Sequence, residues 1–136
     1  MNLLLQIITP EKIVYSDEID EIVVPTIDGE IAILPNHINL LTQIISGELI
    51  VKKGTSTQLL AITGGFLEIN DNKINVLADY AIKAQDVETA RAMEAKKRAE
   101  KIMSEKSTEK DFKIAQGELI KAILELRIST KYKRKT

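Results

Sequence analysis

The sequence predicts a β-rich unit over residues 1–84, folded as an antiparallel sandwich or barrel, followed by an antiparallel pair of helices over residues 85–136. Three observations predict this division. All three prolines and five of the six glycines lie before residue 66, so turn residues are common in the first part and rare in the second. The first part carries five lysines against eleven acids, whereas the second is basic, and the whole chain has a net charge of −1. Apolar residues form short runs in the first part and stripes at helical spacing in the second.

Short runs of apolar and β-branched residues, bounded by turn residues, predict about eight to ten strands in the first part. Asp28-Gly29, Pro35-Asn36 and Asn70-Asp71-Asn72 are typical turn sequences, and Gly64-Gly65 interrupts an apolar stretch. A chain of roughly 80 residues with such frequent turns has room for a core only between two small sheets. The predicted strands are residues 3–9, 12–16, 19–24, 31–34, 44–53, 58–63, 66–69 and 73–78.

Two helices are predicted in the second part. Residues 86–103 contain neither glycine nor proline and predict a helix that Asp86 caps, and Ser107 or Thr108 caps a second one. Because the first apolar stripe is mostly alanine, its partner must approach closely. So small a pair is marginal alone, and we expect it to dock elsewhere and to be able to occupy more than one position. The stripes are Ala92, Ala95, Ala99 and Ile102 in the first helix, and Phe112, Ala115, Leu119, Ala122 (or Ile123) and Leu126 in the second.

The residue inventory argues against an enzyme. The chain has no cysteine and a single histidine, which excludes thiolate and poly-histidine metal sites. Gly64-Gly65 lacks the spacing of a phosphate-binding loop, and no Gly-x-Ser-x-Gly motif occurs. The acids at positions 17, 18, 20 and 21 lack the EF-hand pattern, so a solvated edge strand is favoured over a cation site. We therefore expect no catalytic site, no metal and no required cofactor.

The last ten residues, 127–136, carry five cations and no acid. Cations are expected at the C-terminus of a helix because of its dipole, but five exceed that need and indicate an acidic partner surface. One hypothesis is therefore a free-standing β-sandwich binding module whose basic helical tail binds nucleic acid or another acidic partner. Nucleic acid is disfavoured because Tyr132 is the one stacking group in this segment and the first part of the chain is acidic.

Four segments together resemble the epsilon subunit family of the F-type ATP synthase. Gly29 to His37 resembles the family's Gly-(Glu/Gln)-x-Gly-(Ile/Val)-x-Pro-x-His segment, although Ala32 stands where glycine is frequent. The other three are Gly64-Gly65-Phe66-Leu67-Glu68, Val76-Leu77-Ala78-Asp79, and Val87-Glu88-Thr89-Ala90-Arg91-Ala92, the last resembling the opening of the family's helical hairpin. Each is weak alone, but four in order at suitable spacing are a specific match over nearly the whole chain.

This resemblance implies a ten-stranded β-sandwich over residues 1–84 that binds the rotor and the c-ring, followed by a regulatory two-helix hairpin over residues 85–136. The subunit is then non-catalytic. It packs on the gamma subunit, turns with the c-ring and couples proton flow to ATP synthesis. The c-ring contact implied by the resemblance consists of Glu30, Ile33, Pro35, Asn36 and His37.

The resemblance also implies that the hairpin moves between a compact state and an extended state that reaches the alpha/beta catalytic head and blocks ATP hydrolysis. The expected contacts with an acidic segment of the beta subunits are Arg127, Lys131, Lys133 and Arg134. Some family members bind ATP on the compact hairpin, and the matching positions here are Glu88, Arg91, Ala92, Arg98 and Lys121. Because Glu125 would repel a triphosphate, we expect weak binding of ATP as a regulatory ligand, or none.

No run in the chain approaches the roughly 18 uncharged apolar residues that a membrane span needs, so no membrane-spanning segment is expected. The expected location is the cytoplasmic face of a bacterial plasma membrane, with membrane association only through the complex. An organelle-encoded subunit, at a thylakoid or similar membrane, is the alternative.

Overall fold

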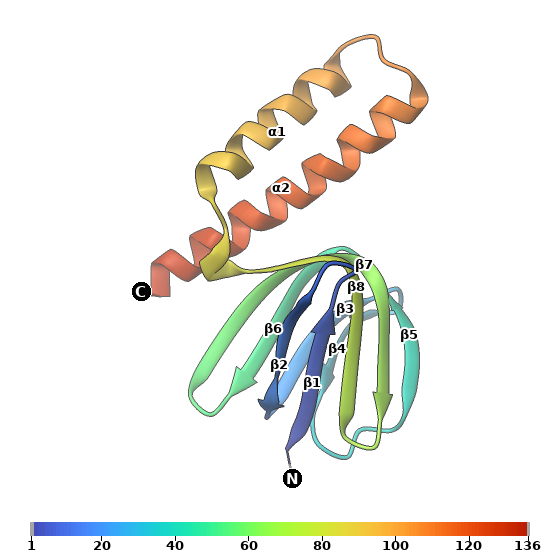
Figure 1. Ribbon diagram of the computed structural model, residues 1–136, viewed down its shortest axis with the longest axis vertical. Helices are drawn as coiled ribbons and strands as arrows, with labels where there is room; N and C mark the ends of the chain where they lie inside the picture. Colours follow the sequence, from blue (N-terminus) through green and yellow to red (C-terminus); the bar gives the residue numbers. More distant parts are fainter. Residues whose placement is uncertain (1, 136) are drawn as a thin grey trace. The chain divides into compact units, whose positions relative to one another are not determined.

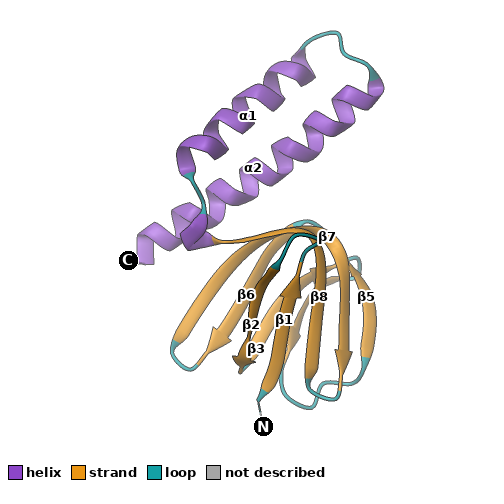
Figure 2. Ribbon diagram, viewed as in Figure 1, coloured by secondary structure: helices purple, strands orange, loops and turns teal. Residues whose placement is uncertain are grey.

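The computed structural model describes the backbone of residues 2–135 and the side chains of residues 2–134, so the side chain of Lys135 lies outside the described residues. The chain divides into two compact units, Met1–Lys83 and Ala84–Thr136. Strands make up the first unit and helices the second (Figures 1 and 2). The predicted order of a β-sandwich followed by a two-helix hairpin is confirmed.

The described part of the first unit contains eight strands, so the number ten implied by the resemblance is wrong. The two last strands are the longest, with 15 residues in β7 and 11 in β8. Neighbouring strands pair antiparallel except β1 and β8, which are parallel. The strands are β1 (Leu3–Ile8), β2 (Ile13–Ile19), β3 (Glu21–Thr26), β4 (Gly29–Ile33), β5 (Leu40–Ile44), β6 (Gly47–Lys53), β7 (Ser56–Asn70) and β8 (Lys73–Lys83).

Strand β7 changes partners along its length. Its first half, up to Ile62, pairs with β6, and its second half, from Gly65, pairs with β5. Gly64 and Gly65 lie at the change, with φ angles of 59° and 130° that favour glycine. A Cβ at Gly65 would come within 2.0 Å of the Leu77 carbonyl oxygen on β8. The glycine pair is therefore the corner at which β7 passes from one sheet to the other.

Alternation along the strands fills the space between the sheets. Inward-facing residues of β1, β3, β6, β7 and β8 are fully or almost fully buried, and their neighbours in sequence face outward. The largest fully buried side chains are Leu3, Leu5, Ile7, Ile19, Ile22, Ile33, Ile44, Leu49, Leu60, Ile62, Leu67 and Ile69. All of them belong to the first unit, which therefore has a core of its own.

Several strand boundaries differ from the sequence prediction. The predicted strands 58–63 and 66–69 are one strand, β7, because the Gly64-Gly65 corner bends the strand without ending it, and β5 begins at Leu40, before the predicted start at Ile44. The run 44–53 is two strands, because β5 ends at Ile44 and β6 begins at Gly47 after a two-residue connection in which the Ile45 N–H bonds to the Pro25 carbonyl (3.1 Å). The last strand continues five residues beyond Ala78, because its C-terminal half pairs with the first half of β7.

The second unit opens with a single 3-10 turn over Ala84–Asp86, followed by α1 (Thr89–Ser104) and α2 (Glu109–Lys135). Asp86 is therefore not the cap of α1; Glu88 holds that position and makes no side-chain cap bond. The predicted Thr108 cap is confirmed, because its hydroxyl accepts the Asp111 N–H at 3.1 Å. Neither helix has a stretch long and apolar enough to span a membrane, over the part of the chain described.

The two helices pack along small side chains. Ala92 and Ala99 of α1 are buried, as are Ala115 and Ala122 of α2. The choice between Ala122 and Ile123 is thus resolved, because Ile123 is exposed. At the open end of the pair the Thr89 hydroxyl lies 3.3 Å from the Ser129 hydroxyl, which fixes the antiparallel register.

Candidate functional site

The loop between β4 and β5, residues 34–39, carries most of the residues predicted to contact the c-ring. Glu30 and Asn36 are exposed, and Pro35 and His37 are half-buried. Ile33 is fully buried in the core, so its side chain cannot contact a partner, and it has to be removed from the predicted contact set. It instead anchors the end of β4 from which the loop begins.

The β7–β8 turn holds this loop through two hydrogen bonds. Asp71 and Asn72 form the turn, both with positive φ (49° and 64°), as expected for a two-residue type I′ hairpin. The Asn36 N–H donates to the Asn72 Oδ1 (2.6 Å), and the Asp71 N–H donates to the Asn39 Oδ1 (3.0 Å). Residues of the loop, among them His37, and residues of the turn line one surface hollow together with Lys73 at the start of β8.

Hydrogen bonds to neighbouring backbone carbonyls orient His37. Its Nδ1 lies 2.8 Å from the Ile38 carbonyl, which only accepts, so Nδ1 carries the proton in this hydrogen bond. The His37 N–H donates to the Leu34 carbonyl (3.2 Å). This arrangement leaves Nε2 as the ring atom that can engage a partner.

The loop also exposes apolar side chains that the sequence prediction did not include. Ile38 is 77% exposed and Leu34 is 51% exposed. Both neighbour predicted contact residues, and their hydrophobicity was visible in the sequence. What could not be seen there is that the loop turns them outward, because the core positions of β4 are already filled by residues such as Ile33.

A second surface crosses four strands of one sheet. The registers Phe66–Leu77, Leu77–Ile8 and Ile8–Ile13 place these four residues side by side across β7, β8, β1 and β2, on one face. Ile13, Phe66 and Leu77 are 58%, 54% and 51% exposed, and Ile8 is half-buried. We call Phe66, Leu77, Ile8 and Ile13 the apolar row. A contiguous exposed apolar strip of this kind is typical of a protein-interaction site.

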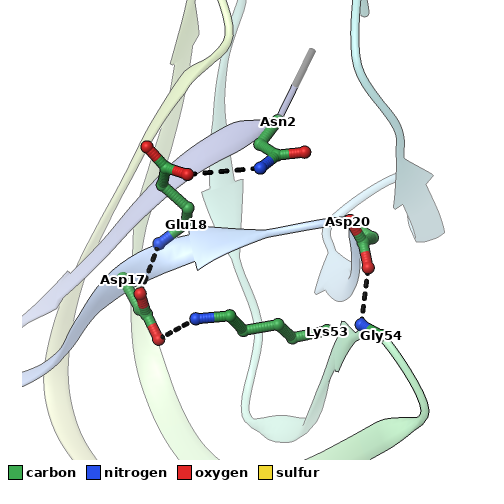
Figure 3. Close-up of polar contacts among 6 residues, drawn as sticks. All are labelled: Asn2, Asp17, Glu18, Asp20, Lys53 and Gly54. Carbon is green, nitrogen blue, oxygen red and sulfur yellow. Dashed lines mark hydrogen bonds and ion pairs between the residues drawn. The ribbon is translucent and has the colours of Figure 1, made fainter.

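The acids at positions 17–21 line the edge of the sheet, where β2 is the terminal strand. Figure 3 shows how they are used: Asp17 pairs with Lys53 (2.6 Å), Glu18 accepts from Asn2 (3.2 Å), and Asp20 accepts the Gly54 N–H (2.6 Å). Among the described residues, no cluster of acids and histidine is suited to a metal ion. Asp17 and Asp20 therefore tie the end of β6 and the β6–β7 turn to the β2 edge, while Glu18 bonds to the residue before β1.

The Asp17–Lys53 pair also changes two acidities. The hydrogen bond that the Lys53 ammonium donates holds the pKa of Asp17 below its ordinary value. The Asp17 carboxylate in turn raises the pKa of Lys53. Tyr15 lies nearby, and burial, followed by the charge of Asp17, raises its pKa.

The residues predicted for ATP binding are spread over both helices. Arg91 and Arg98 are exposed, and the Arg91 guanidinium is 3.3 Å from the Glu88 carboxylate. Ala92 is buried in the helix pair, and Lys121 on α2 is half-buried. The register set by Thr89 and Ser129 places Lys121 about level with Arg98. The structure thus brings cations of both helices to one level without forming an enclosed site around them.

The basic end of α2 is exposed. Arg127, Lys131 and Arg134 recur at spacings of four and three residues, so they line one face of the helix. Lys133 points elsewhere: its Nζ donates to the Thr89 hydroxyl (3.2 Å) at the start of α1. The four predicted inhibitory residues therefore form a cationic face of three residues and one residue that ties the helices together.

Both units match models of known protein families. Residues 2–84 match the model described as "ATP synthase, Delta/Epsilon chain, beta-sandwich domain", and residues 85–130 match "ATP synthase, Delta/Epsilon chain, long alpha-helix domain". The chain belongs to the ATP synthase delta/epsilon family. The family resemblance of the four sequence segments is thereby confirmed.

Curated relatives of this family are ATP synthase epsilon chains. The chain is 49% identical to that of Dehalococcoides mccartyi over 77% of its own length and 75% of the relative's. It is 44% identical to that of Desulforamulus reducens, over 88% of this chain and 90% of the relative. The relatives that the chain resembles over most of its length are therefore epsilon chains, and the alternative of a free-standing nucleic-acid-binding module gains no support.

Solved structures share the fold. A chain in a structure of Euglena gracilis mitochondrial ATP synthase containing OSCP, F1 and the c-ring aligns with a TM-score of 0.73 at 20% identity, covering 95% of this chain and 81% of that one. A chain of the Tetrahymena thermophila mitochondrial central stalk and c-ring aligns with a TM-score of 0.61 at 15% identity, covering 95% and 97%.

Proposed function

We propose that this chain is a non-catalytic rotor subunit of an F-type ATP synthase, which links the gamma subunit to the c-ring and couples proton flow to ATP synthesis. The observation that carries the proposal is that both units match the family along residues 2–130, so neither half is a separate addition. The fold neighbours come from structures that contain the c-ring or the central stalk, which supports the same partners.

The two surfaces of the β-sandwich suit two partners. The β4–β5 loop meets the β7–β8 turn at one end of the strands, whereas the apolar row crosses the face of the sheet. We assign the β4–β5 loop to the c-ring, as the family resemblance implies, and the apolar row to gamma, because a permanent subunit contact is usually more apolar than the surface around it.

Retention of gamma and the c-ring by the tagged full chain, from detergent-solubilised membranes of its source, tests the proposal. We expect both to be retained. Phe66→Ser combined with Leu77→Ser should weaken gamma binding by about tenfold or more, because it removes two exposed apolar side chains from the interface. Ile27→Ser is the matched control, since Ile27 is equally exposed (57%) in the β3–β4 turn outside the row. Retention of neither partner by the unaltered chain would refute the proposal.

The helical unit is proposed to inhibit ATP hydrolysis by extending toward the alpha/beta head, where the cationic face of α2 meets an acidic segment of beta. The small size of the buried residues of α1, Ala92 and Ala99, supports this, because each buries little apolar surface and two states can then lie within a few kcal/mol. A chain ending at residue 85 keeps the whole core of the sandwich. We expect it to join the complex but to leave ATP hydrolysis faster than the full chain does. Equal hydrolysis rates with both chains would remove the inhibitory role.

ATP binding to the hairpin is proposed to be weak or absent. Arg91 is engaged with Glu88, and Glu125 on α2 is half-buried and adds negative charge where a triphosphate would need cations. Isothermal titration of the full chain with ATP should therefore show no binding in the micromolar range. Micromolar affinity would show that the five positions named above form a regulatory site.

Membrane association is proposed to occur only through the complex, at the cytoplasmic face. Treatment that strips the F1 sector from inside-out vesicles should release the chain together with gamma. A chain that stays with stripped vesicles would contradict this location.

A further inference from the structure

The β7–β8 turn and the β4–β5 loop are joined more closely than their separation of 36 residues in the chain would suggest. Asn72 makes three contacts within this region. Its Oδ1 accepts the Asn36 N–H at 2.6 Å, its Nδ2 lies 3.5 Å from the Asn36 Oδ1, and its carbonyl accepts the Leu4 N–H at 2.9 Å. The side chain therefore connects loop and turn, while the backbone connects the turn to β1.

Asparagine is suited to this position for two reasons. Its φ of 64° lies in the left-handed region, which asparagine tolerates better than most residues. Its amide also offers an acceptor and a donor from one short side chain, so it can meet both the N–H and the side-chain oxygen of Asn36. Few residues meet both requirements at once.

The loop needs such a connection because it has no regular structure of its own. Residues 34–39 lie between β4 and β5 outside both strands, and Asn36 itself has a φ of 68°. A loop that must be ordered on binding loses affinity to the conformational entropy of ordering. A loop already held by Asn72 avoids that loss.

We propose that Asn72 is a positioning residue for the c-ring contact: through its bond to the Asn36 N–H it holds the β4–β5 loop in the conformation that presents His37 and Ile38. This inference rests on the proposed c-ring contact of the loop. Asn72 acts through Asn36 and needs no ring contact of its own.

Three variants of the full chain separate this role from a general effect on the turn. Asn72→Gly removes the side chain and keeps the backbone free to adopt positive φ. Asn72→Asp keeps an oxygen at the acceptor position. Asp71→Gly is the matched control, because Asp71 is the other turn residue with positive φ, and its N–H still donates to Asn39 without its side chain.

Binding of the chain in complex with gamma is measured on immobilised c-ring, at about 0.3 M salt so that the added charge of the aspartate is screened. Amide exchange of Asn36 reports the hydrogen bond itself. We expect Asn72→Gly to weaken c-ring binding about tenfold, the effect of losing one hydrogen bond that orders the loop, and to speed Asn36 exchange. Asn72→Asp should restore most of both, and Asp71→Gly should leave both unchanged.

Four results would be read separately. Equal c-ring binding by Asn72→Gly and the unaltered chain, with Asn36 exchange accelerated, would refute the positioning role while leaving the c-ring contact intact. Equal losses in Asn72→Gly and Asp71→Gly would refute it in favour of a general requirement for the turn. Loss that Asn72→Asp does not restore would refute the acceptor role of Oδ1. Absence of c-ring binding by the unaltered complex would instead refute the proposed function on which the inference rests.

Discussion

Substitution of Gly65 by alanine should unfold the β-sandwich much more readily than the same substitution at Gly64. At Gly65 the new Cβ would lie 2.0 Å from a backbone oxygen of β8, and φ is 130°, in a region that alanine rarely adopts. Strain of that kind costs about 1–3 kcal/mol, and separating β7 from β8 to relieve the overlap adds lost packing, so we expect a total of about 4 kcal/mol or more. At Gly64 the nearest atom is a side-chain oxygen of Asp79 at 3.0 Å, which can move away. The φ of 59° then leaves about 1–2 kcal/mol.

The comparison can be made by urea unfolding followed by tyrosine fluorescence. The chain has three tyrosines, and Tyr132→Phe removes the one in the helical unit, so that Tyr15 and Tyr80 report the sandwich alone. With a slope of about 1–1.5 kcal/mol per molar urea, the midpoint should fall by about 1 M in Gly64→Ala and by about 3 M in Gly65→Ala. Equal midpoints for the two variants would refute the close approach of β7 and β8 at the corner.

Three further changes should have measurable effects. Gly117→Ala should stabilise the helical unit by about 0.5–1 kcal/mol in thermal melting, because Gly117 lies inside α2 with no atom near its missing Cβ; a lower melting temperature would contradict this. Lys53→Met should raise the pKa of Asp17 toward its ordinary value in a carboxyl NMR titration. In the unaltered chain, the stabilisation from the pair is present above the ordinary carboxyl pKa and is lost as pH falls through the lowered one; an unmoved Asp17 pKa would show that Lys53 is not its cause. Thr89→Val should speed amide exchange in the first turn of α1, since it breaks the contacts with Ser129 and Lys133, whereas Thr130→Val, whose hydroxyl bonds only within its own helix, should not. Unchanged amide exchange in Thr89→Val would show that these contacts do not hold the start of α1 against the end of α2.

Local patterns predicted most of the elements because their causes are local. The alternation in β1 and β3 and the alanine stripe of α1 follow directly from which face each residue must bury. The local sequence does not separate β5 from β6, because Gly47 is equally compatible with a bulge inside one strand; what separates the two strands is a change of partner along β7. The glycine pair predicts a break in the chain, because only the partner strands show that it is a corner within one strand.

The candidate site was predictable in part. The position of His37 followed from a family resemblance, whereas the burial of Ile33 required knowledge of the pleat of β4. The sequence predicts Asn72 only as a turn residue. Its hydrogen-bond partner, Asn36, lies 36 positions earlier, and no local signal connects the two. The resemblance predicts that Lys133, like Arg127, contacts the beta subunits. In this structure the Lys133 ammonium instead donates to the Thr89 hydroxyl of the same chain.

Strand β8 has a mechanical consequence. It begins immediately after the turn that holds the β4–β5 loop and continues without interruption to Lys83, one residue before the helical unit begins. Its 11 residues span about 36 Å, and hydrogen bonds to β1 and β7 brace it along its length. If the turn meets the ring as proposed, a force applied to it would pass through these hydrogen bonds into β1 and β7, so the whole sheet and not the turn alone would carry the load.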